Sequence, residues 1–144
     1  MSGSDDSIDE AERRRKVAEQ KVWGAAIEAI DRMRKQPVAY SIILRLWSLY
    51  NSINDLLNTA KIIGKNTDPA SIAPTFTTEQ TNFLISTYNS IIEDIHSNLR
   101  KKDPYVTKFS AFKLLHEPTI NDVVKTLFMM ETNALQIMSY MLRW

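Results

Sequence analysis

Charge is distributed very unevenly along this chain of 144 residues. Residues 1–36 contain eight Lys or Arg and eight Asp or Glu, whereas residues 37–60 contain two charged residues and residues 126–142 contain one. A helix with few charges is rarely exposed on all sides, so we expect the charge-poor stretches to pack against one another. The pattern predicts a charged N-terminal helical arm, 1–36, and a bundle body, 37–144, within a single domain overall.

Apolar residues recur every three or four positions along most of the chain, and most of the three Gly and five Pro lie between these periodic stretches. This spacing predicts helices, and no alternating run predicts a strand. We therefore expect an all-α bundle of four to five helices, with a first helix that is charged and projects in part. The expected helices span residues 7–36, 37–63, 77–102, 104–115 and 119–142.

Specific signals mark some of the helix ends. Thr119 is followed three residues later by Asp122, the spacing of a capping box, so we expect the last helix to begin here. Gly64 is expected to end the second helix, because glycine commonly follows the last helical turn. Asp103 and Pro104 predict the start of the fourth helix. Its apolar residues are Val106, Phe109, Phe112 and Leu115.

Composition excludes several functional classes. The chain has no Cys, which excludes disulfide scaffolds, thiolate zinc sites and cysteine nucleophiles. Its net charge is +1 and its cations are mostly interleaved with acids, so we expect no nucleic-acid partner. The basic run at 13–16 is flanked by acids at helical spacing, which predicts a solvated face; a membrane-surface patch is the alternative. The start is unlike a signal peptide and indicates a cytoplasmic protein, unless a leader was removed.

The search for catalytic chemistry finds one candidate motif. Glu93 and His96 lie three positions apart on one predicted helix, the spacing found in carboxylate-bridged di-iron bundles. Such a site needs a second Glu-x-x-His pair, but the other histidine, His116, belongs to none. We therefore predict no metal site, no cofactor and no catalytic residue, and hence no enzyme.

Contact with another protein is suggested by aromatic, methionine and uncharged polar residues. The second helix carries an uncharged polar face, which suits either water or the charge-depleted centre of an interface. Methionines on the last helix suit either a core or an adaptable groove. The interaction candidates are Trp23, Trp47, Asn51, Asn54, Asn58, Met130 and Trp144.

The leading functional prediction is a non-enzymatic bundle that acts through protein–protein contacts, as an assembly or scaffold component or as an oligomer. The alternative is a bundle that binds or converts a small molecule in an internal cavity lined by residues such as Tyr88, Trp47, Met138 and His96. A protein partner or self-association is expected, a small molecule stays open, and association with a membrane surface is not expected.

Part of the chain resembles a known family. From Phe76–Glu79 through the third helix, and again from Asn121–Val124 to Tyr140, it is similar to the helical TraI-type proteins of Bacteroides conjugative transposons. The resemblance covers about half of the sequence. It implies an exported, non-catalytic component of a mating-pair apparatus, akin to the minor pilus subunits of type IV secretion systems. The charged arm departs from that pattern, and no functional residue is carried over.

Overall fold

The computed structural model describes residues 3–98, 105 and 108–143. In this part of the chain the fold is all-α, as predicted, and its β-structure is limited to one isolated bridge between Ile72 and Thr119. The helices are α1 (Gly3–Arg34), α2 (Pro37–Asn66), α3 (Thr75–Asn98) and α5 (Ile120–Met141).

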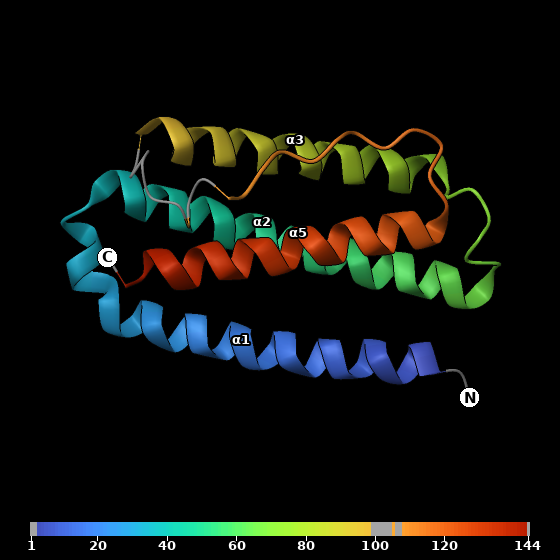
Figure 1. Ribbon diagram of the computed structural model, residues 1–144, viewed down its shortest axis with the longest axis horizontal. Helices are drawn as coiled ribbons and strands as arrows, with labels where there is room; N and C mark the ends of the chain where they lie inside the picture. Colours follow the sequence, from blue (N-terminus) through green and yellow to red (C-terminus); the bar gives the residue numbers. More distant parts are fainter. Residues whose placement is uncertain (1–2, 99–104, 106–107, 144) are drawn as a thin grey trace.

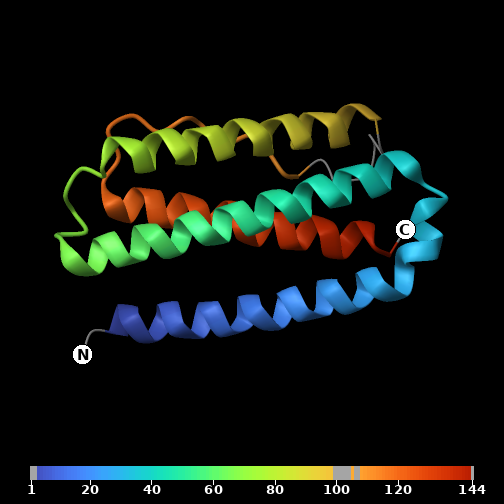
Figure 2. The ribbon, with the colours of Figure 1, turned by 180° about the vertical axis from the view of Figure 1, so that it is seen from behind.

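The helices form a bundle with α2 and α5 at its centre and α1 and α3 on opposite sides (Figure 1). Figure 1 views the side on which α5 lies in front of α2, and Figure 2 views the side on which α2 lies in front. α2 runs antiparallel to both α1 and α3, whereas α5 runs in the same direction as α3. The chain must therefore return along the bundle between α3 and α5.

The core forms where the apolar stripes of α2, α3 and α5 meet. Leu46, Ile53 and Leu57 of α2 are fully excluded from water, as are Ile85 of α3 and Leu127 of α5. Each such side chain contributes roughly 1.5–3 kcal/mol relative to an exposed position. The charge-poor stretches are therefore buried against one another over much of their length.

The predicted helix over residues 104–115 is wrong over residues 109–115, which are extended and not helical, although residue 105 is helical. Two asparagine side chains of α3 hold this segment by its main chain. Asn82 donates to the Leu115 carbonyl at 3.0 Å and accepts from the Leu115 N–H at 2.7 Å. Asn89 makes the same pair of bonds with Phe112, both at 2.9 Å. Each amide thus acts as a neighbouring strand would.

Burial along this segment repeats every third residue. Phe109 and Pro118 are buried, Phe112 and Leu115 are partly buried, and the residues between them are exposed. Three residues of an extended chain span about 10 Å. Seven residues of an α-helix span about 10.5 Å, so the amides of Asn82 and Asn89 match main-chain sites three residues apart. The three-residue spacing of apolar side chains that predicted a helix is therefore also found in this extended segment.

The C-terminal end of α2 and the N-terminal end of α5 meet at one end of the bundle. The predicted capping box is confirmed, because Thr119 Oγ1 accepts from the Asp122 N–H at 3.1 Å and Asp122 Oδ2 accepts from the Thr119 N–H at 3.0 Å. The predicted stop at Gly64 is wrong, since α2 continues to Asn66. A Cβ on Gly64 would lie 3.3 Å from Cγ2 of Ile120, so close approach of the two helices explains the glycine instead.

Candidate interaction surface

The outward row of α2 is exposed and nearly uncharged. It lies between α1 and α3 on the side seen in Figure 2. Its residues recur at steps of four and three, every one of them is exposed, and Asp55 is the single charged member. The row extends for about 27 Å along the helix. We call it the α2 face: Leu44, Ser48, Asn51, Asp55, Asn58 and Ile62.

One end of the α2 face is strongly apolar. Trp23 and Ile27 of α1 are 54% and 61% exposed, and Leu44 of α2 is 51% exposed. These three side chains surround a hollow of about 210 Å³ between α1 and α2. Trp23 stacks on Trp47, with ring centroids 5.4 Å apart, and Trp47 stacks on Tyr50 at 5.5 Å. The stack fixes Trp23 in place while leaving half of it in water.

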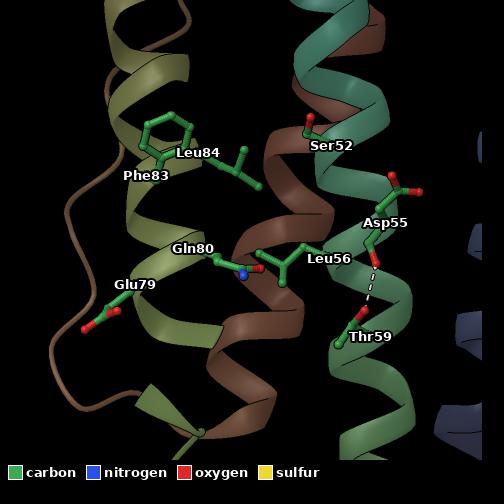
Figure 3. A pocket seen from close by; sticks show the side chains of 8 residues that line it. All are labelled: Ser52, Asp55, Leu56, Thr59, Glu79, Gln80, Phe83 and Leu84. Atoms are coloured by element: carbon green, nitrogen blue, oxygen red, sulfur yellow. Dashed lines mark hydrogen bonds between the residues drawn. The ribbon is translucent and has the colours of Figure 1, made fainter. Parts of the chain in front are cut away.

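The far side of the α2 face borders α3 at a shallow hollow of about 480 Å³ (Figure 3). Phe83 is 71% exposed here and lies beside Leu84, across from Leu56 of α2. The two carboxylates of this hollow, Asp55 and Glu79, point away from each other in Figure 3. They therefore do not form the paired acid and base that hydrolytic chemistry requires.

A buried ion pair joins α1 to α5. The guanidinium of Arg15 donates from Nη1 to Glu131 Oε1 and, at 2.8 Å, to Asn54 Oδ1. The side chains of Arg15 and Glu131 are 8% and 0% exposed, and Arg15 Nε and Glu131 Oε2 have no partner. Burial raises the pKa of Glu131 above its ordinary value, although Arg15 opposes the shift. The pair therefore ties the charged helix into the core at a desolvation cost.

Further polar contacts flank this pair along α1. Tyr50 donates from Oη to Glu19 Oε2 at 2.7 Å, and burial together with this bond raises the tyrosine pKa above its ordinary value. Lys61 and Glu12 form an ion pair, and burial lowers the pKa of Lys61. α1 is thus anchored by polar bonds and by the tryptophan stack, in addition to the burial of Val22 and Ala29 in the core.

The structure separates the predicted interaction residues into distinct environments. Trp23 and Trp47 lie together, and Asn51 and Asn58 are exposed on the α2 face. Asn54 is instead turned toward α1, where it accepts from Arg15. Two further candidates do not lie on this surface: Met130 is fully buried in the core, and Trp144 lies outside the described residues.

Sequence reasoning missed Ile27, Leu44 and Phe83, which are among the most exposed apolar side chains. All three lie off the buried stripe of their helices, and an apolar residue in that position was the available signal. Of the residues proposed to line an internal cavity, Tyr88 is packed in the core and accepts from Asn133 Nδ2 at 3.2 Å. Burial raises the pKa of Tyr88 to about 12.

Across the described residues, no group of three His, Asp or Glu side chains could hold a metal ion. Nor does any helix in that part of the chain have the length and apolar character needed to cross a membrane. No protein family model matches the chain, and the curated proteins and the solved structures contain no match either. The resemblance to TraI-type proteins stays a prediction, and the surface itself is the basis for assigning a function.

Proposed function

We propose that this protein is a non-enzymatic helical bundle that acts through protein–protein contact, as an assembly or scaffold component, and that the α2 face is its contact surface. The observation that carries the proposal is the exposure of this nearly uncharged row beside Trp23, Ile27 and Leu44. Interface centres are depleted of charge, and tryptophan is enriched among the residues that dominate binding energy.

The magnitudes are consistent with a specific interface. Covering the exposed parts of Trp23, Ile27 and Leu44 removes on the order of 300 Å² of apolar surface from water, worth about 7 kcal/mol. Association costs at least about 4 kcal/mol, so these three residues alone give a weak complex. The α2 face together with the bordering parts of α1 and α3 is about 27 Å long and three helices wide, and offers roughly 500–800 Å², which approaches the area each partner buries in a stable complex.

A charge placed on the α2 face tests the proposal. Leu44→Glu inserts a carboxylate beside Trp23, whereas Met129→Glu makes the same change at a 47% exposed position of α5. We expect the unaltered protein to self-associate in light scattering or to retain a partner in native pull-down with crosslinking. Leu44→Glu should abolish that contact and Met129→Glu should preserve it, with circular dichroism confirming that both variants fold. A strict monomer at high concentration that retains no partner would contradict the proposal.

The resemblance to TraI-type proteins suggests that the partner belongs to a conjugation or secretion apparatus. On this view the first turns of the charged helix α1 project toward that partner, which stays a prediction. The genomic neighbourhood is the test: adjacent genes for such an apparatus would support this assignment, and their consistent absence beside related genes would remove it.

A further inference from the structure

A second surface lies on the other side of the bundle, between α1 and α5. It is a groove of about 980 Å³ lined by side chains of both helices. Ala11 and Ala18 of α1 lie opposite Phe128, Leu135 and Tyr140 of α5. Because alanine carries one methyl group, the α1 side leaves space that a larger residue would fill. The groove therefore has an apolar floor.

The groove edges are basic. Arg14 and Lys21 lie on α1, and Arg143 follows the end of α5. The one carboxylate among the lining residues, Glu10, pairs with Arg14 at 3.3 Å, but the Arg14 side chain is 79% exposed, so the pair is weak and an incoming carboxylate can replace Glu10. Arg15 also lines the groove, but its charge is matched by Glu131. Lys21 and Arg143 form no ion pair with another described residue, so the net charge at the edges is positive.

The size of the groove indicates a helical occupant. Its lining runs from Glu10 to Val22 on α1 and from Phe128 to Arg143 on α5, so the groove is about 20 Å long. A volume of about 980 Å³ over that length gives a mean cross-section of about 50 Å². A helix with its side chains is about 10–12 Å in diameter, roughly 80–110 Å² in cross-section. The groove can thus take one face of a helix and leave the other in water.

The spacing of the cations also favours a helix over a small anion. Arg14 and Lys21 are seven residues apart, which places them about 10.5 Å from each other along α1. One carboxylate or phosphate cannot contact both side chains at that separation without bending them together. Acidic residues seven positions apart on an incoming helix repeat at the same distance and can reach both.

We propose that the groove between α1 and α5 binds an acidic amphipathic helix of a partner protein. Apolar residues of that helix would pack on Leu135, Phe128 and Tyr140, and its carboxylates would pair with Arg14 and Lys21. The groove is lined by residues of α1 and α5 together with Tyr105 and Arg143, so it shares no residue with the α2 face.

Fluorescence anisotropy with a labelled peptide tests this proposal. The probe is a fluorescein-labelled helical peptide of about 21 residues, long enough to span the groove, with a Leu and Ile stripe edged by Glu at seven-residue intervals. Its control has Lys at every Glu position. We expect the Glu peptide to bind, the Lys peptide not to bind, and the affinity of the Glu peptide to fall as salt is raised.

Variants of α1 locate the binding. Arg14→Glu combined with Lys21→Glu should lower the affinity for the Glu peptide by at least about tenfold, because two attractive charge pairs become repulsive. Arg13→Glu reverses a charge on the same helix at a 77% exposed side chain outside the groove, and should change affinity by less than about twofold. Ala18→Phe fills the floor without changing charge and should also block binding. Circular dichroism confirms that each variant is folded.

Several results would overturn the proposal: no binding of the Glu peptide, equal binding of the Lys peptide, or unchanged affinity in the Arg14→Glu/Lys21→Glu variant. Stabilisation of the protein by sodium dodecanoate without any peptide binding would also overturn it, and would assign the groove to a small amphipathic anion. None of these results depends on the α2 face, whose Leu44→Glu variant should bind the peptide normally.

Discussion

The buried pair of Arg15 and Glu131 gives the most specific prediction about stability. Removing one partner leaves the other charge buried without compensation, which typically costs about 3–5 kcal/mol. Both side chains are almost completely buried, so water cannot replace the missing partner without rearrangement of α1. Either Arg15→Met or Glu131→Leu should therefore lower the free energy of unfolding by about that amount. For a chain of this size the midpoint of thermal unfolding should fall by about 6–20 °C.

The double variant Arg15→Met/Glu131→Leu should behave differently. It removes both charges together with the unpaired Arg15 Nε and Glu131 Oε2 atoms, and it replaces them with apolar groups of similar length. Such replacements are often neutral or stabilising. We expect a stability within about 1 kcal/mol of the unaltered protein, or above it, and hence a coupling energy of at least about 5 kcal/mol in magnitude.

The pH dependence of Arg15→Met provides an internal check. Burial raises the pKa of Glu131 in the folded protein above its unfolded value. A carboxyl shifted in this direction destabilises the fold above its folded pKa, and the penalty disappears as the pH falls below the unfolded pKa. Without Arg15 the pKa of Glu131 should rise further. The loss of unfolding free energy in Arg15→Met should therefore become smaller as the pH is lowered from about 7 to about 4.5.

Urea unfolding followed by circular dichroism and tryptophan fluorescence measures all four proteins at both pH values. The reasoning is refuted if the free energy of unfolding of the double variant is as low as that of the less stable single variant. It is also refuted if each single change costs less than about 1 kcal/mol, because the charges would then be solvated rather than buried.

Two other predictions concern local backbone interactions. Asn89→Ala removes both hydrogen bonds to the Phe112 main chain. It should lower the free energy of unfolding by about 1–3 kcal/mol and end the hydrogen-exchange protection of the Phe112 amide. Retained protection would contradict the attachment of this segment by Asn89. Gly24→Ala should raise the unfolding free energy by about 0.5–1 kcal/mol, because a Cβ there meets nothing within 4 Å. Gly64→Ala should raise the unfolding free energy by less, since its Cβ would lie 3.3 Å from Ile120. An equal increase in both variants would refute that distinction.

Much of the fold is predictable because long helices repeat their apolar residues many times. α2 and α5 keep this period over 30 and 22 residues, and the capping box at Thr119 fixes where α5 begins. The segment at 109–115 is not predictable in this way. Its apolar residues lie three apart, a spacing that suits an α-helix but is also found in this extended segment. The Asn82 and Asn89 side chains that hold the extended segment are distant in sequence.

The anchoring of α1 was only partly visible in the sequence. Pairing of Glu10 with Arg13 and Arg14 follows from helical spacing and is confirmed. Nothing local distinguishes Arg15 from its basic neighbours, so its burial was missed. Glu131 was the available signal: a lone charge in a charge-poor helix requires a partner, and a buried carboxylate is rarely left without one.

The way Asn82 and Asn89 hold the extended segment has a consequence for how the protein can vary. Both amides contact only main-chain atoms, so the outward side chains at Ala111, Lys113 and Leu114 do not take part in this attachment. Substitution there can change the chemistry of the surface and leave the scaffold as it is. The length of the segment cannot vary in the same way. One residue inserted between Phe112 and Leu115 would shift one of these attachment points out of reach of its asparagine. The sequence of this segment can therefore vary at its outward positions while its length stays fixed.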